Sequence, residues 1–134
     1  MAFFSEPHLS EAYRMAYQYY QTRQYREALP LFRVLVVGNH EERKYWKGMA
    51  ACLQMIQEWK EALLCYQTAI FLDPDSDLEL YIHAADCCFS MDQVNEGLDL
   101  LNKVKEKAEK AGNKHILTHV DLMESVWNNH LKVR

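Results

Sequence analysis

The chain has 134 residues, of which 49% are hydrophobic and 25% charged, with a net charge of -4 at pH 7. These values are ordinary for a globular protein and predict one domain over residues 1–134. The negative charge gives no electrostatic support to nucleic-acid binding. No apolar run reaches the ~20 residues that span a bilayer, and no basic segment opens the chain. We therefore expect a cytoplasmic protein without a signal peptide or membrane insertion.

Residues 46–74 combine large and small side chains at helical spacing. Two antiparallel helices approach closely only where a small residue on one faces a large residue on the other. Pro74 lacks an amide hydrogen and is expected to end the second helix. This arrangement is typical of a tetratricopeptide (TPR) repeat, a helix-turn-helix unit of about 34 residues. The residues at the large and small positions are Trp46, Met49, Ala50, Leu53, Ala62, Tyr66, Ala69 and Pro74.

The same pattern recurs one period towards the N-terminus. A shift of about 34 residues predicts helices over residues 7–22 and 25–37. Ser5 is the candidate N-cap, and Gly38-Asn39 is the expected end of the second helix. Pro30 should kink that helix or displace its start. The matching packing residues are Ala12, Met15, Ala16, Tyr19, Ala28 and Phe32.

A third copy follows with a step of about 35 residues, and we place the extra residue in the turn at residues 73–77. Its helices should cover residues 78–90 and 93–111 and end at Gly112-Asn113. Residues 114–132 have one apolar stripe, made of Ile116, Leu117, Val120, Met123, Val126 and Trp127. We therefore predict an all-α fold: three tandem TPR repeats, over about 9–42, 43–77 and 78–111, and a capping helix over about 114–132.

The first helices of stacked TPR repeats line a concave groove. In the first repeat the predicted groove positions are Tyr13, Tyr17 and Tyr20, which form a second stripe beside the packing face. In the second repeat they are Lys44, Lys47, Ala51 and Gln54, and in the third Glu79, Ile82, Asp86 and Phe89. A lining of aromatic and then polar side chains suits an extended peptide. The alternative is that the tyrosines are covered by the protein's own N-terminal residues or by a second copy.

Other residue combinations give little support to chemistry. His115 and His119 lie one helical turn apart but lack a third ligand at a suitable spacing. Asp73, Asp75 and Asp77 lack the glycine and terminal glutamate of a calcium loop, so they fit turn formers and caps. No glycine-rich phosphate loop or nucleophile elbow is present. We expect no metal, no cofactor and no enzymatic activity. Four cysteines, Cys52, Cys65, Cys87 and Cys88, are expected to be buried thiols, in preference to disulfides or a zinc site.

Several motifs give the chain a family resemblance. They are Ala12-Tyr13-x-x-Ala16-Tyr17-x-x-Tyr20, Tyr25-x-x-Ala28 with Phe32, Gly48-x-Ala50-Ala51-Cys52 with Trp59-x-x-Ala62, and His83-Ala84-Ala85-Asp86-Cys87. Over about residues 9–110 the chain resembles the class II translocator chaperones of bacterial type III secretion systems, the SycD/LcrH/IpgC type.

The resemblance implies that an extended N-terminal segment of a hydrophobic translocator protein binds in the groove. This binding would keep the translocator soluble until secretion. Tyr13, Tyr17, Tyr20 and Tyr25 match the groove aromatics of the family. Family members usually carry a further N-terminal helix that takes part in dimerisation, whereas only residues 1–9 precede the first repeat here. Either the chain is truncated or it assembles differently, with Phe3-Phe4 as a residual contact. Homodimer formation is therefore left open.

Two alternative functions remain. The chain could be a TPR chaperone of the secretion needle subunit, which would bind as an amphipathic helix. It could also be a general TPR scaffold that assembles folded proteins through its convex face.

Overall fold

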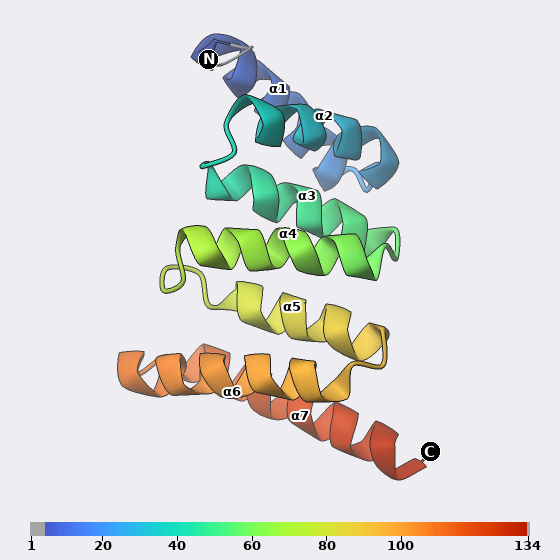
Figure 1. Ribbon diagram of the computed structural model, residues 1–134, viewed down its shortest axis with the longest axis vertical. Helices are drawn as coiled ribbons and strands as arrows, with labels where there is room; N and C mark the ends of the chain where they lie inside the picture. The colour runs from blue at the N-terminus through green and yellow to red at the C-terminus, as the bar shows by residue number, and fades with distance from the viewer. Residues whose placement is uncertain (1–4, 134) are drawn as a thin grey trace.

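The computed structural model describes residues 5–133, and their side chains as far as residue 130. The described residues form seven α-helices and no strand, stacked in chain order from the N-terminus to the C-terminus (Figure 1). The predicted all-α TPR fold is confirmed. The helices are α1 (Glu6–Gln21), α2 (Tyr25–Gly38), α3 (Arg43–Met55), α4 (Trp59–Leu72), α5 (Glu79–Ser90), α6 (Val94–Ala111) and α7 (Lys114–Val133).

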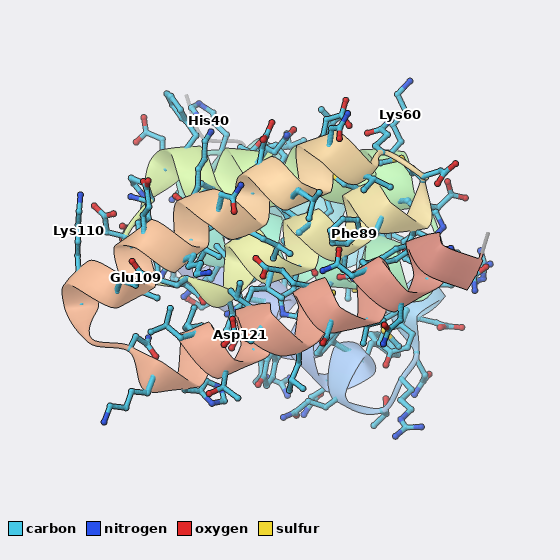
Figure 2. The ribbon with its side chains drawn as sticks, turned by 90° about the horizontal axis from the view of Figure 1, so that it is seen from below. His40, Lys60, Phe89, Glu109, Lys110 and Asp121 are labelled. Carbon is cyan, nitrogen blue, oxygen red and sulfur yellow. The ribbon has the colours of Figure 1, made fainter. Side chains whose placement is uncertain are left out.

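Each helix packs mainly against the helix before it and the helix after it in the chain. Two further contacts join α1 to α3 and α5 to α7. Viewed along the stack, α4 and α6 lie on one side while α1 and α7 lie on the other (Figure 2). The contacts of α1 with α3 and of α5 with α7 bring these alternate helices beside one another. None of the described helices is both long and apolar enough to cross a membrane.

Small residues are buried between the helices, as the sequence pattern predicts. Ala16, Ala28, Ala50 and Ala62 are completely buried, in a core that also contains Phe32. A methyl group at these points lets the neighbouring helix approach, and the large side chains beside it fill the remaining space. The core of the first two repeats is therefore built from alternating small and large residues.

Gly48 of α3 lies at a further close helix contact. A Cβ atom added there would lie 2.2 Å from Cε1 of Phe32 on α2, well inside van der Waals contact. The missing side chain thus makes room for the Phe32 ring, which is itself buried. Gly97 of α6 accommodates Phe89 of α5 in the same way, with a Cβ–Cε1 distance of 2.5 Å.

The repeat period is visible in the backbone. One residue between the two helices of each pair has a left-handed conformation: Arg23, Gln57 and Asp92, with φ angles of 63°, 66° and 62°. These positions recur at the predicted steps of about 34 and about 35 residues. The following amide donates the same hydrogen bond each time, from Gln24 to Tyr19, from Glu58 to Leu53 and from Gln93 to Cys88, all at 2.8 Å. The same turn therefore joins the two helices within each of the three pairs.

The helix ends lie close to their predicted positions, with one difference. Ser5 occupies the N-cap position of α1, but its side chain makes no capping bond. Its Oγ instead lies 3.0 Å from Nδ1 of His8. Gly112 ends α6 in a left-handed conformation with φ of 66°, as expected. Helix α2 begins at Tyr25 and runs through Pro30, so the proline does not displace its start; the kink stays a prediction.

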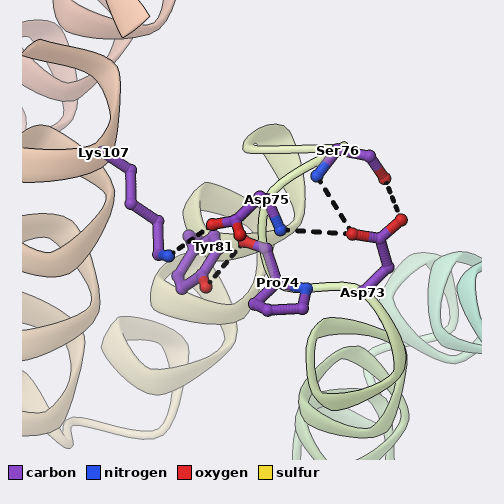
Figure 3. A network of polar contacts seen from close by, with 6 residues as sticks. All are labelled: Asp73, Pro74, Asp75, Ser76, Tyr81 and Lys107. Atoms are coloured by element: carbon purple, nitrogen blue, oxygen red, sulfur yellow. Dashed lines mark hydrogen bonds and ion pairs between the residues drawn. The ribbon is translucent and has the colours of Figure 1, made fainter. Parts of the chain in front are cut away.

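The link from α4 to α5 covers residues 73–78, against residues 39–42 for the link from α2 to α3. The extra length thus lies where the sequence placed it. Asp73 organises the turn, because its carboxylate accepts hydrogen bonds from the amides of Asp75 and Ser76 and from the Ser76 hydroxyl (Figure 3). Lys107 of α6 binds Asp75 at 2.6 Å, and the Tyr81 hydroxyl donates to the carbonyl of Pro74 at 3.0 Å. The turn is thereby tied to both α5 and α6.

Helix α7 packs on α5 and α6 through Ile116 and Val120, which are buried. Trp127 stacks on Phe89 with 4.6 Å between ring centroids. Val126 is 61% exposed, so the prediction that it joins the packing stripe is wrong. It lies one residue before Trp127, and a helix turned to bury the indole leaves Val126 facing away. The Phe3-Phe4 pair lies outside the described residues.

All four cysteines are buried free thiols, as predicted. Burial raises the pKa of Cys52 and of Cys87 to about 12, and that of Cys65 to about 11. Burial also raises the pKa of Cys88. The reactive thiolate is therefore scarce at neutral pH in the folded chain.

We predict that the native protein at pH 8 shows no fast reaction with a thiol reagent such as dithionitrobenzoate. Both the raised pKa values and the burial oppose attack, so labelling should follow local or global opening. In denaturant all four thiols should react at the rate of free cysteine. A thiol that reacts at that rate in the native protein would contradict the packing described.

Gly48→Ala should destabilise the fold. Replacing glycine by alanine inside a helix normally stabilises by about 1 kcal/mol. Here the added Cβ collides with Phe32, and we expect a loss of about 1–3 kcal/mol in the free energy of unfolding, measured by urea titration with circular dichroism.

Phe32→Leu in the Gly48→Ala background is the control, since it removes the ring atoms that the new methyl group meets. The double variant should be more stable than the sum of the two single losses predicts. If Gly48→Ala is as stable as the wild type, the close approach of α2 and α3 is not as described.

Candidate peptide-binding groove

A pocket of about 380 Å³ opens between α1 and α3. Aromatic rings form its α1 wall, and the cationic side chains of α3 stand opposite. Phe32 of α2, whose buried ring fills the space beside Gly48, also belongs to the lining. The lining residues are Tyr13, Tyr17, Tyr20, Phe32, Arg43, Lys44, Lys47, Gly48 and Ala51. We call this the tyrosine pocket.

A second pocket of about 320 Å³ lies further along, between α3 and α5. Its lining residues are Tyr20, Lys47, Ala51, Gln54, Met55, Tyr66, His83 and Asp86. We call it the polar pocket. Tyr20, Lys47 and Ala51 belong to both linings, so the two pockets form one continuous groove along α1, α3 and α5.

The tyrosines of α1 form a chain of rings along the groove. The centroids of Tyr13 and Tyr17 lie 6.1 Å apart, and those of Tyr17 and Tyr20 lie 6.4 Å apart, both in stacked arrangements. Tyr25, at the start of α2, meets Tyr20 edge to face at 5.6 Å. Tyr17 is 45% exposed, while Tyr13 and Tyr20 are half-buried. The stripe thus presents ring surface to solvent, while Tyr13 and Tyr20 also pack against the core.

The hydroxyls of Tyr13 and Tyr20 stay protonated at neutral pH, because their pKa values are raised. Burial raises the pKa of Tyr13, with smaller contributions from Tyr17 and Glu42, and burial likewise raises the pKa of Tyr20. Among the described residues, neither hydroxyl makes an internal hydrogen bond. Such rings combine apolar area with a free donor, which is why tyrosine is common where proteins bind peptides.

The floor of the polar pocket is a hydrogen-bonded network across three helices. The hydroxyl of Tyr66 on α4 donates to Oε1 of Gln54 on α3 at 2.7 Å. Nε2 of Gln54 then donates to Oδ2 of Asp86 on α5 at 2.9 Å. His83 stacks on the Tyr66 ring with 5.6 Å between centroids, and burial lowers its pKa. A neutral imidazole in this position is a donor and an acceptor for a ligand.

Most of the predicted groove positions lie together. Tyr13, Tyr17, Lys44, Lys47 and Ala51 line the tyrosine pocket, Tyr20 lines both pockets, and Gln54 and Asp86 line the polar pocket. Tyr25 contributes to neither lining and instead packs against Tyr20. That these residues contact a ligand stays a prediction.

Two predicted groove residues are in the core instead. Ile82 is 1% exposed and Phe89 is 2% exposed, so neither lines a groove. Both belong to the core cluster that joins α5 and α6 to α7. The cause is the capping helix, which lies against α5 and covers this part of its surface (Figure 2). The open groove therefore extends only as far as Asp86.

The sequence did not place Arg43, Met55, Tyr66 and His83 in the groove. Tyr66 was assigned to packing alone, and its ring is indeed buried, but its hydroxyl reaches Gln54. A general rule could have indicated this contact, because a buried tyrosine hydroxyl needs a hydrogen-bond partner. His83 lies three residues before Asp86 and so on the same helical face.

The histidine pair of α7 has a structural partner. His115 Nε2 lies 3.4 Å from Oε1 of Glu79, and His119 Nδ1 lies 3.1 Å from Oε2 of the same residue. These contacts tie α7 to the start of α5. No group of three or more potential metal ligands occurs among the described residues.

The sequence is similar to that of a known protein from Yersinia. The chain is 27% identical over 116 residues to low calcium response locus protein H of Yersinia pestis, which covers 86% of this chain and 68% of that protein. No family model matches the chain.

Solved structures agree. The type III secretion chaperone SycD of Yersinia enterocolitica, in complex with a peptide of the translocator YopD, superposes with a TM-score of 0.83 at 26% identity, covering 97% of this chain and 98% of that one. An alternative dimer of SycD gives 0.82 at 25% identity, with 94% and 96% covered. PcrH bound to the chaperone binding region of PopD shares the fold, with a TM-score of 0.84 at 20% identity over 97% and 98% of the chains. Sequence and fold together confirm that the chain resembles the class II translocator chaperones of type III secretion systems.

Proposed function

We propose that this chain is a type III secretion chaperone that binds an extended segment of a hydrophobic translocator protein in its groove. The observation that carries the proposal is the continuous groove from Tyr13 to Asp86, on a chain 26% identical to SycD, whose structure was solved with a translocator peptide.

The groove suits an extended chain for physical reasons. Apolar side chains of the client would enter the tyrosine pocket and the polar pocket, which share a wall at Tyr20 and Ala51. Aromatic pockets of this kind give much of the binding energy of a peptide interface. The client backbone leaves its own amides and carbonyls unpaired when extended, and His83 and Asp86 offer partners for them.

Binding of this kind would protect the client without any chemical step. A translocator exposes apolar segments that aggregate or enter membranes before secretion, and a chaperone that holds one segment lowers the free concentration of that form. We infer a non-enzymatic role in the bacterial cytoplasm, with no cofactor. Assembly into a homodimer is consistent with the SycD dimer.

The test is a pair of substitutions, Tyr17→Ala with Tyr20→Ala. The chain is co-expressed with the products of its neighbouring reading frames, captured by a tag, and its partners are identified by mass spectrometry. The wild type should retain a protein with long apolar segments. The double variant should capture at least about tenfold less of that protein, because two aromatic contacts together contribute more than about 1.4 kcal/mol to binding.

Phe71→Ala is the matched control, since Phe71 is an aromatic residue on α4 outside both pockets and is 85% exposed. It should leave capture unchanged, and circular dichroism should show all variants folded. Equal capture by the folded double variant and the wild type would overturn the proposal. Capture lost only with Phe71→Ala would favour a scaffold that binds through its convex face.

A further inference from the structure

The tyrosine pocket is positively charged on a protein whose net charge is -4. Arg43, Lys44 and Lys47 line it, and its lining includes no acidic residue. Three cations this close together on one helix repel one another unless carboxylates lie nearby. The partners of each cation therefore decide whether the pocket has unused positive charge.

Only Lys47 has a close carboxylate partner. Its Nζ lies 2.6 Å from Oδ2 of Asp77. The polar pocket, which Lys47 also lines, contains Asp86 as a further carboxylate. The charge at that end of the groove is thus balanced by residues of the chain itself.

Lys44 has no such partner. Its ammonium lies over the ring of Tyr13, 4.7 Å from the centroid, and 5.8 Å from the centroid of Tyr45. Cation–π contacts hold the ammonium at the pocket wall while leaving it able to bind an anion. Among the described residues it makes no ion pair or hydrogen bond.

Arg43 is also incompletely paired. Its Nη1 is shielded from solvent and has no hydrogen-bond partner among the described residues. Hydrogen bonds from Ser76 and Asp75 lower the pKa of Asp73, and the charge of Arg43 also helps to lower it but is the smallest of the causes. A shielded guanidinium nitrogen without an acceptor is unfavourable, and an acceptor brought by a ligand would relieve it.

We propose that the tyrosine pocket selects clients carrying an acidic side chain beside the apolar residue that enters it. The inference rests on the proposed function and specifies the client's chemistry. The carboxylate would lie between Lys44 and Arg43, where charge-assisted hydrogen bonds are the strong ones. The neutral Tyr13 hydroxyl supplies a further donor. The apolar neighbour would rest on the rings of Tyr17 and Tyr20.

The experiment selects peptides from a displayed library of random short sequences, with the full chain as bait. Wild type, Lys44→Glu and Lys60→Glu are compared, since Lys60 is an exposed lysine on α4 outside both pockets (Figure 2). One selected peptide and its matched amide, with Glu→Gln or Asp→Asn, are then measured by fluorescence anisotropy against wild type and Lys44→Gln at two salt concentrations.

The expected result is enrichment of spaced apolar residues with Asp or Glu at one fixed offset, for wild type and Lys60→Glu alike. Lys44→Glu should remove the acidic preference. The amide peptide should bind wild type about tenfold more weakly than the acidic one, as for one charge-assisted hydrogen bond. That ratio should shrink in Lys44→Gln and at high salt.

Two outcomes overturn the inference, and they are distinguishable from failure of the proposed function. If the selected peptides share spaced apolar residues but no acidic residue, the chaperone proposal stands and the inference of an acidic client is wrong. An acidic preference that persists in Lys44→Glu would place the anion elsewhere and likewise overturn it. If no apolar pattern is selected at all, the proposed function fails and this inference fails with it.

Discussion

The close approach of neighbouring helices is the constraint on which the rest of the structure depends. It is set by residues with little or no side chain, such as Ala50, Ala62 and Gly48, which let bulky residues on the next helix fill the contact. The packing residues of α1, such as the buried Ala16, occupy one face of the helix, and the groove side beside it is left partly exposed. The tyrosine stripe lies there, and the distance between α1 and α3 decides how wide the tyrosine pocket is.

The repeats share a framework but not a surface. The same left-handed turn joins each helix pair, so successive first helices present equivalent positions to one side. Their side chains differ: α1 supplies rings, α3 supplies cations and Gln54, and α5 supplies His83 and Asp86. Gln54 connects these parts, since its amide accepts from Tyr66 and donates to Asp86. Binding character therefore changes along the groove while the packing stays constant.

The fold followed from the sequence because its cause is local and repeated. Size alternation at helical spacing gave the helices, the period and the cap to within a few residues. The far end of the groove did not follow, because Ile82 and Phe89 stand at positions equivalent to open ones in the other repeats. Whether such a position is open depends on what packs next, and α7 covers both. The link from Tyr66 to Asp86 through Gln54 was also missed, since it joins residues of three helices and no spacing in the sequence encodes it.

The most direct test of the central claim is where the client touches the chain. In one variant a photo-crosslinking benzophenone side chain would replace Tyr17 in the groove, and in another it would replace Phe71 on the exposed side of α4. Each variant would be irradiated in complex with the captured client. We predict that the probe at position 17 cross-links to a single short segment of the client, and that the probe at position 71 gives no product. Cross-links from position 71 with none from position 17 would contradict the account.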